Sequence, residues 1–151
     1  MMGENVHFSS KSTKWNTPLE LYEALHKEFN FQLDPCPRNP VYDGLLIDWN
    51  LTTYVNPPYG REIGKWIEKA YTSSLKGHTI VMLIPSRTDT DWWHKYIMKA
   101  NEIRFIKGRL YFNVGKGCAP FPSAVVIYRG GERRILPRFV TIDKKGAMLH
   151  E

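Results

Sequence analysis

The sequence predicts one α/β domain in which helices cover the faces of a short, mostly parallel sheet. Residues 79–84 form a continuous apolar run of the kind found in strands that are buried on both faces of a sheet. Residues 63–71 carry apolar side chains at the period of an amphipathic helix. Segments of these two kinds alternate along the chain, as they do in α/β domains.

Length, composition and charge fit a globular protein with a polyanionic partner. The 151 residues are 42% hydrophobic and 24% charged, which suffices for one core without disulfides or metal. Twenty-one Lys and Arg against fifteen Asp and Glu give a net charge of +6, so a nucleic acid is a plausible partner. The two cysteines are too far apart for a disulfide framework or a closed zinc site, and we predict no metal.

We expect a soluble, cytoplasmic protein without a membrane partner. No apolar run approaches the length of a membrane span, and no charged segment followed by an apolar one begins the chain. Residues 1–14 are polar and lack a period, so we expect a flexible N-terminal arm before a single domain at residues 15–151. The sequence identifies no protein partner.

The first predicted helix runs from Pro18 to about residue 29. Thr17 followed by Glu20 fits a capping box, and proline is favoured at the first helical position. These structural roles explain Thr17 and Pro18 completely. A functional alternative stays open, because an exposed helix N-terminus also receives carboxylates and phosphates and Trp15 offers a stacking surface beside it.

Two short strands are predicted next, and each ends in an acidic residue. Residues 31–33 lead to Asp34, and residues 45–47 lead to Asp48 and Trp49. Open α/β sheets bind ligands at the carboxyl ends of strands, where Asp34 would lie and where Asp48 would hold a pair of ribose hydroxyls. The alternative is that these residues only cap a turn or close a strand.

The most specific motif, Asn56-Pro57-Pro58-Tyr59-Gly60, follows a predicted strand at residues 52–55. The two prolines restrict the backbone, so the Asn56 side chain and the nearby carbonyls are held rigid as acceptors. Together with the flat face of Tyr59, they suit a planar ring that carries an amino group. If Asn56 and the Pro57 carbonyl accept the two amino hydrogens, the nitrogen lone pair points at an electrophile. The alternative is a rigid turn without chemistry.

The second half of the chain completes the predicted sheet. The helix that follows the motif ends at Gly77, and a further helix begins at a capping pattern of Thr88 and Asp91. The tail after residue 128 alternates only weakly. Strands are predicted at residues 103–106 and 123–128, with a hairpin or a broken strand at residues 110–113.

Arg87 and Arg109 follow predicted strands and are placed to meet phosphates. Arg87 ends the 79–84 strand, on the same sheet edge as Asn56 if the two strands are parallel. Arg109 follows a glycine in a basic turn. Arginine binds phosphate oxygens bidentately, so both residues are candidate contacts to a nucleic acid. The alternative for both is ordinary solvated charge.

These motifs resemble the small phage-encoded DNA adenine methyltransferases of the Dam-like family. The resemblance rests above all on residues 56–60, and also on residues 15–18, 31–35, 48–49, 84–87, 108–112 and 120–123. It implies a small, truncated Rossmann-like fold with a mixed, mostly parallel sheet, in a protein of the host bacterial cytoplasm. It further implies S-adenosylmethionine-dependent methylation of the exocyclic amino group of adenine in double-stranded DNA.

The resemblance also assigns site residues. The catalytic set would be Asn56, Pro57, Pro58 and Tyr59. The cofactor-binding set would be Trp15, Thr17, Pro18, Asp34 and Asp48. Transfer to RNA or to a protein amide, and a non-catalytic nucleic-acid-binding relative, are the alternatives.

The cofactor side departs from the usual methyltransferase pattern. Residues 34–40 stand where a Gly-rich loop is usual, and the stretch from Asp34 to Asn56 is too short for two full βα units. We therefore expect a truncated sheet, because the motifs at residues 15–18 and 56–59 are both intact; degraded cofactor binding is the alternative.

Overall fold

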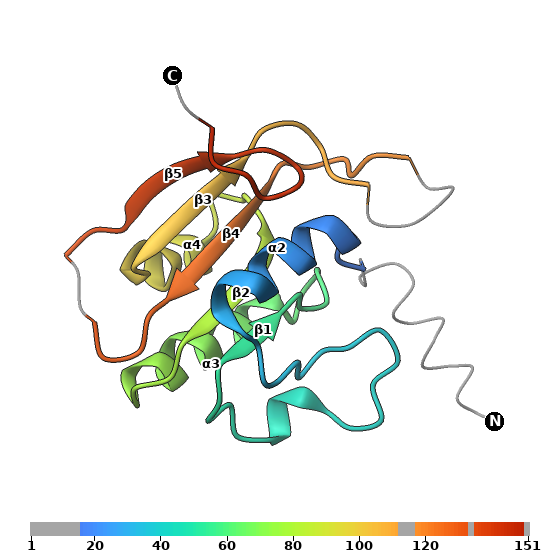
Figure 1. Ribbon diagram of the computed structural model, residues 1–151. Helices are drawn as coiled ribbons and strands as arrows, with labels where there is room; N and C mark the ends of the chain where they lie inside the picture. The colour runs from blue at the N-terminus through green and yellow to red at the C-terminus, as the bar shows by residue number, and fades with distance from the viewer. Residues whose placement is uncertain (1–15, 112–116, 133–134, 150–151) are drawn as a thin grey trace.

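The structure is a computed structural model, and it describes residues 16–111, 117–132 and 135–149. The expected N-terminal arm and Trp15 lie outside these residues. The described chain forms a five-stranded sheet in the order β1-β2-β4-β3-β5 (Figure 1). The strands are β1 Thr53–Val55, β2 Ile80–Pro85, β3 Glu102–Ile106, β4 Ser123–Tyr128 and β5 Arg138–Ile142.

Among these strands, β4 alone runs against the others. β1 is parallel to β2, and β3 is parallel to β5, whereas β4 is antiparallel to both of its neighbours, β2 and β3. The prediction of a mixed, mostly parallel sheet is therefore confirmed. β2 and β4 are buried at every residue because the helices cover both faces of the central strands, and this burial explains their continuous apolar sequences.

Helix α2 (Leu19–Phe29) covers one face of the sheet, and α3 (Ile63–Leu75) and α4 (Asp91–Lys95) cover the other (Figure 1). Both α2 and α3 confirm predicted helices. Their buried apolar residues are Leu21 and Leu25 of α2 and Ile63, Trp66, Ile67 and Ala70 of α3. Within the described chain, no helix has the length and apolar character needed to cross a membrane.

The predicted capping box of α2 is wrong. The N-cap residue is Pro18, and within the described chain no side chain caps the first turn. The Thr17 hydroxyl bonds to Tyr54 and Asn56 instead, because the end of β1 brings these side chains within its reach. Thr17 therefore belongs to the sheet edge rather than to the helix.

The start of α4 also differs from the prediction. Thr90 rather than Thr88 is the N-cap, and its hydroxyl accepts a hydrogen bond from the Trp93 N–H at 3.2 Å. The helix is short, and the chain continues as a 3-10 helix, η2 (Ile97–Lys99).

The predicted strand at residues 31–33 is reduced to one pairing. Leu33 forms an isolated parallel bridge to Thr53 of β1. The pairing stops there because Pro35 follows so closely, and proline has no N–H to donate to a ladder. On this side the sheet is truncated, as expected from the short stretch before Asn56.

The predicted strand at residues 45–47 is wrong. Residues Gly44–Leu46 form a 3-10 helix, η1, which begins where the Asp43 carboxylate accepts the Leu45 N–H at 2.9 Å. This side-chain bond to the backbone offers the chain an alternative to a strand ladder. An apolar triplet without a period does not distinguish the two outcomes.

Strand β5 lies outside the predicted elements. It is an edge strand in which Ile142 is buried and three of the other four residues are exposed, so no alternation of apolar residues marks it. The predicted hairpin at residues 110–113 is not formed in its described part, because neither Leu110 nor Tyr111 belongs to a strand. Residues 112 and 113 lie outside the described chain.

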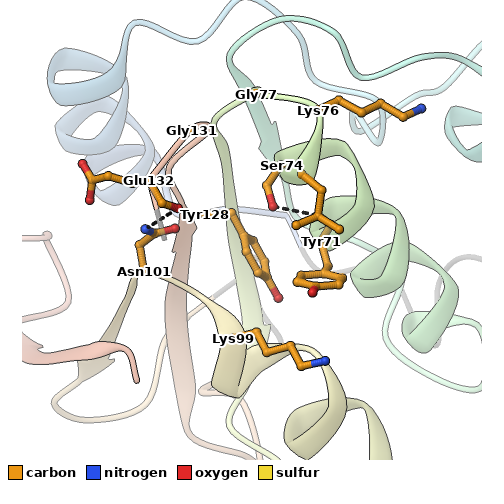
Figure 2. A pocket seen from close by; sticks show the side chains of 10 residues that line it. Tyr71, Ser74, Lys76, Gly77, Lys99, Asn101, Tyr128, Gly131 and Glu132 are labelled. Atoms are coloured by element: carbon orange, nitrogen blue, oxygen red, sulfur yellow. Dashed lines mark hydrogen bonds between the residues drawn. The ribbon is translucent and has the colours of Figure 1, made fainter. Parts of the chain in front are cut away.

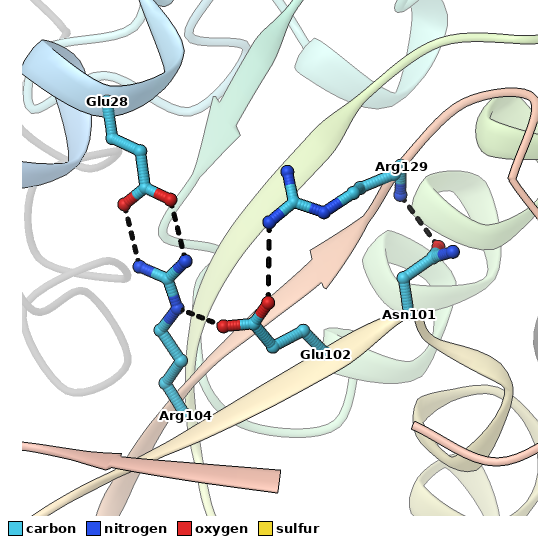
Figure 3. Close-up of polar contacts among 5 residues, drawn as sticks. All are labelled: Glu28, Asn101, Glu102, Arg104 and Arg129. Carbon is cyan, nitrogen blue, oxygen red and sulfur yellow. Dashed lines mark hydrogen bonds and ion pairs between the residues drawn. The ribbon is translucent and has the colours of Figure 1, made fainter. Parts of the chain in front are cut away.

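A charged cluster of Glu28, Glu102, Arg104 and Arg129 ties α2 to the sheet (Figure 3). Arg104 of β3 donates to both carboxylate oxygens of Glu28 on α2, at 2.8 and 2.7 Å. Its Nε donates to Glu102 at 2.6 Å, and Arg129 donates to the other oxygen of Glu102 at 3.3 Å. Two acids and two arginines cancel in charge. The cluster holds the carboxyl-terminal turn of α2 against the sheet.

Candidate active site

The strand directions bring three loops together at one edge of the sheet. β1 and β2 are parallel neighbours, so residues 56–60 and 86–90 leave the sheet at the same edge. β4 runs the other way, so residues 119–122 arrive there, and the Ser86 N–H donates to the Pro122 carbonyl at 2.9 Å. We call this edge of the sheet, where β1, β2, β3 and β5 end and β4 begins, the carboxyl edge. Ligands of open α/β sheets bind at this position.

The Asn56 amide is buried at the carboxyl edge and bonded at both ends. Its Oδ1 accepts a hydrogen bond from the Tyr59 hydroxyl at 2.8 Å, and its Nδ2 donates to Thr17 Oγ1 at 3.1 Å. The Tyr59 hydroxyl also lies 3.0 Å from the Leu83 carbonyl. These contacts hold the side chain in one place, which is the rigidity that the two prolines predict for the motif.

Tyr54 of β1 extends the hydrogen bonds around Asn56 through Thr17. Its hydroxyl lies 2.6 Å from Thr17 Oγ1. The Tyr22 ring meets the Tyr54 ring edge-on at 5.1 Å, and Phe31 packs on it at the same distance. Burial raises the pKa of Tyr54, so its hydroxyl stays protonated at neutral pH. In the sequence Tyr54 looks only like a strand residue, and no signal there marks its hydroxyl.

The Tyr59 ring lies on the other side of the amide. It is 6% exposed, and the Phe121 ring meets it edge-on at 5.5 Å and an angle of 73°. The Arg87 guanidinium lies 5.7 Å from the centre of the Phe121 ring. Tyr59, Phe121 and Arg87 therefore form a continuous row along the carboxyl edge. The sequence does not mark the contact of Phe121 with Tyr59, because it joins segments far apart in the chain.

A cavity of about 320 Å³ opens on the Thr17 side of Asn56. Its volume is at the lower end of the range for small-molecule sites, about 300–1,000 Å³. The Asp34 carboxylate lines the cavity and also accepts the Cys36 N–H at 3.0 Å, so this acid both caps a turn and faces the cavity. The lining residues are Asn16, Thr17, Leu19, Tyr22, Asp34, Cys36, Arg38, Tyr54 and Asn56.

Only some of the predicted cofactor-binding residues line the cavity. Thr17 and Asp34 line it, whereas Pro18 adjoins Thr17 as the N-cap of α2 without lining the cavity. Asp48 is exposed and lies outside the lining, because the next residue, Trp49, turns inward and donates its Nε1–H to the Gly44 carbonyl at 2.9 Å. Trp15 lies outside the described residues.

The two predicted phosphate-binding arginines both lie at the carboxyl edge. Arg87 follows β2 directly and is exposed. Arg109 follows β3 and is also exposed, and it donates to the Ala119 carbonyl at 3.4 Å. The expected alignment of Arg87 with Asn56 is confirmed, because β1 and β2 are parallel.

A second cavity, of about 440 Å³, lies at the opposite end of the sheet (Figure 2). Tyr71 and Tyr128 form its wall, and Lys76 and Lys99 lie at its two ends. Among the described residues, none of the predicted site residues lines this cavity, although it is the larger of the two. Among the described residues, no group of His, Cys, Asp and Glu side chains is arranged to hold a metal.

A mixed α/β sheet with an Asn-Pro-Pro-Tyr loop beside a cavity at its carboxyl edge defines a Rossmann-like methyltransferase. Residues 6–123 match the family model described as DNA N-6-adenine-methyltransferase (Dam). The chain is also 27% identical over 119 residues to the DNA N-6-adenine-methyltransferase of Haemophilus phage HP1 (strain HP1c1), across 70% of this chain and 69% of the phage protein. The chain belongs to the DNA N-6-adenine-methyltransferase (Dam) family, the adenine-specific DNA methyltransferases.

Proposed function

We propose that the chain transfers the methyl group of S-adenosylmethionine to the exocyclic amino nitrogen of adenine in double-stranded DNA. Asn56, Pro57, Pro58 and Tyr59 form the amino-group site. The observation that carries the proposal is the Asn56 amide, which is held between the cavity of about 320 Å³ and the Tyr59 hydroxyl. A methyl donor in the cavity and a base on the Tyr59 side would both reach this amide.

Asn56 and Pro57 supply the acceptors that the amino group needs. The exocyclic nitrogen is a poor nucleophile, because its lone pair is delocalised into the adenine ring. When Asn56 Oδ1 and the Pro57 carbonyl accept its two hydrogens, the nitrogen becomes more tetrahedral and its lone pair points at the cavity. An amide oxygen accepts two hydrogen bonds, so the bond from Tyr59 is compatible with this role.

S-adenosylmethionine, when bound, would supply an electrophilic methyl group: the amine nitrogen would bond to the methyl carbon as the carbon–sulfur bond breaks, and the amine would release a proton to solvent. The cavity lining fits such a donor. Asp34 offers a carboxylate to hydroxyl or ammonium groups, and Arg38 offers a guanidinium to a carboxylate. The aromatic rings of Tyr22 and Tyr54 favour a cationic sulfonium nearby.

The Tyr59 ring would receive the extruded base. Base stacking on an aromatic side chain contributes about 1–3 kcal/mol, comparable to the few kcal/mol needed to extrude a base from a duplex. Because the ring is 6% exposed, entry of the base requires that the side chains around it separate. Asn56 is itself 3% exposed, so the same separation would be needed for the base to reach its amide oxygen.

Basic residues at the carboxyl edge support a DNA partner. Arg87 follows β2, Lys107 and Arg109 follow β3, and Lys144 follows β5, and all four are exposed. β3 and β5 run in the same direction as β1 and β2, so these cations lie at the edge that carries Asn56. A phosphate backbone along this edge would bring a base close to Tyr59.

Incubation with methyl-labelled S-adenosylmethionine and adenine-containing duplex DNA tests the proposal. We expect label in the adenine amino group, DNA affinity that falls with salt as phosphate contacts release counterions, and weaker labelling of competing RNA or protein. A cofactor at 100 times its Kd stabilises the fold by about 2.7 kcal/mol, which a thermal-shift titration detects. If no label is transferred in several sequence contexts and no thermal shift occurs, the protein is a non-catalytic nucleic-acid-binding relative instead.

A further inference from the structure

The cavity of about 440 Å³ at the opposite end of the sheet from Asn56 has no role in the proposed transfer, and we call it the end cavity. It shares no lining residue with the cavity beside Asn56. Its volume lies within the range for small-molecule sites, about 300–1,000 Å³. The end of α3, η2, the start of β3 and the turn after β4 surround it (Figure 2).

Two lysines from different elements reach the end cavity. Lys76 is the C-cap of α3, and Lys99 is the last residue of η2. Both are exposed, and within the described chain no carboxylate forms an ion pair with either. Glu132 also lines the cavity, but its carboxylate points away from both lysines (Figure 2). The charge that faces the cavity is therefore positive, which favours an anionic ligand.

The carbonyls at the end of α3 do not cancel this charge. A helix C-terminus is partly negative because its last carbonyls lack donors. Here the Tyr71 carbonyl accepts a hydrogen bond from the Ser74 hydroxyl at 2.7 Å. The Ser73 and Ser74 carbonyls accept backbone N–H groups at 3.1 and 3.0 Å. These carbonyls already have donors within the chain, so the two ammonium groups decide which charge the cavity accepts.

A buried amide adds a hydrogen-bond donor to the wall. Asn101 lines the end cavity and is 6% exposed. Its Oδ1 accepts the Arg129 N–H at 2.7 Å, and its Nδ2 donates to the Glu132 carbonyl at 3.3 Å. An amide nitrogen carries two hydrogens, so within the described chain one of them is left for a ligand. The lining therefore suits a ligand that is rich in acceptors.

Aromatic rings form the wall between the two lysines (Figure 2). The half-buried Tyr71 ring lies 5.6 Å from the Tyr96 ring and 6.2 Å from the Tyr128 ring. The Tyr128 hydroxyl donates to the Tyr96 carbonyl at 2.7 Å, which fixes this wall. Lys99 Nζ lies 5.3 Å from the centre of the Tyr71 ring, so a cation and an aromatic surface stand together. Such a pair suits a flat ring that carries acceptor atoms.

We infer that the end cavity binds a mononucleotide. One lysine pairs with the phosphate, and the other lysine and the Asn101 amide donate to acceptor atoms of the base. The flat base lies against the tyrosine wall. Inorganic phosphate would leave this wall without a contact, and an uncharged nucleoside would leave both lysines without an anion. The inference does not rest on the proposed function, and its failure would leave that function unaffected, because Asn56 belongs to the other end of the sheet.

Calorimetric titration of the full chain with AMP, adenosine and inorganic phosphate tests the class of ligand. We expect AMP to bind at least about 10-fold more tightly than either of the other two, because only AMP engages both the lysines and the tyrosine wall. Absence of AMP binding would overturn the inference. Inorganic phosphate or adenosine binding as tightly as AMP would overturn it too, since the base or the phosphate would then contribute nothing.

Substitutions of the two lysines locate the bound AMP. Lys76→Met and Lys99→Met should each weaken AMP binding about 10-fold or more, the value of one hydrogen bond to a charged group. Because both lysines are exposed, neither substitution disturbs the core. Lys95→Met is the matched control and should bind as wild type does. Lys95 is an exposed lysine whose Nζ lies 5.4 Å from the centre of the Tyr96 ring, and it does not line the end cavity.

Two further variants distinguish the end cavity from the other places where a nucleotide could bind. Arg38 lines the cavity beside Asn56, and Arg87 lies at the carboxyl edge. Arg38→Met and Arg87→Met should leave AMP affinity at the wild-type value. If either of them weakens AMP binding while Lys76→Met and Lys99→Met do not, the nucleotide binds elsewhere and the inference is wrong.

Discussion

Arg104 is the residue whose buried charge most depends on its neighbours. Its side chain is 3% exposed and pairs with Glu102, at 4% exposed, and with Glu28, at 42% exposed. Removing one member of a buried ion pair leaves an uncompensated charge in the interior, which costs more than the pair contributes. The charged cluster should therefore be sensitive to the loss of its central arginine.

We expect Arg104→Met to lower the free energy of unfolding by about 3–5 kcal/mol, because Glu102 stays buried with only the longer bond from Arg129. Urea unfolding measures the change. Lys65→Met is the matched control, since Lys65 pairs with Glu62 at the surface, where such a pair contributes about 0–1 kcal/mol. Equal effects of the two substitutions would contradict the account.

The pH dependence of stability should carry the signature of Glu28. Hydrogen bonds from Arg104 lower the pKa of Glu28, and partial burial opposes them only in part. A lowered folded pKa means that the stabilisation is complete above the unfolded pKa and is lost as pH falls through the folded pKa. The difference in unfolding free energy between wild type and Glu28→Gln should shrink on acidification. If this difference in unfolding free energy grows as the pH falls, the pKa of Glu28 is not lowered in the folded state and the account is wrong.

At the residue scale, local sequence patterns predict candidate site residues: the Asn-Pro-Pro-Tyr motif, Thr17 and Asp34. Tyr54 and Phe121 could not be found in this way. Tyr54 reaches Thr17 across 37 positions, and Phe121 reaches Tyr59 from the loop before β4. Such contacts follow from the strand order, which no local pattern contains.

At the scale of elements, η1 supports the cavity of about 320 Å³ from outside. Gly44 packs so closely that a Cβ atom there would lie 1.9 Å from the Pro35 carbonyl oxygen and 2.9 Å from the Trp66 ring. Pro35 stands between Asp34 and Cys36, which both line the cavity. The close approach of η1 therefore fixes the loop that presents the Asp34 carboxylate.

We expect Gly44→Ala to lower both the melting temperature and the affinity for S-adenosylmethionine, because the added methyl displaces the Pro35 carbonyl. Gly64→Ala is the matched control: its Cβ would lie 3.8 Å from the nearest atom, in α3, where alanine is favoured over glycine by up to about 1 kcal/mol. Thermal-shift titration of both variants checks this. Wild-type cofactor affinity in Gly44→Ala would show that η1 does not support the cavity.

The long elements could be predicted because their periods are strong. The apolar repeat of α3 and the continuous apolar runs of β2 and β4 follow directly from burial on one or both sides. The short or exposed elements could not, since η1 has three residues and β5 buries little. For these, local side-chain bonds and edge pairing decide the structure.

At the scale of the whole molecule, the strand directions create one functional edge. β1, β2, β3 and β5 all end there, and β4 begins there. This arrangement gathers the Asn-Pro-Pro-Tyr loop, the row of Tyr59, Phe121 and Arg87, and the basic turns after β3 and β5. The cavity lies on one side of Asn56 and the tyrosine ring on the other, as a transfer between two ligands requires.

The rate of methyl transfer by Asn56→Ala tests this arrangement most directly. We expect a loss of about 100-fold or more, the scale for removing one preorganised polar group, with cofactor affinity by thermal shift near wild type. Asn56→Asp, which keeps an acceptor oxygen, should lose less, and Asn50→Ala, at an exposed asparagine, should lose nothing. A wild-type rate for Asn56→Ala would contradict the account, because the amide would then not hold the amino group.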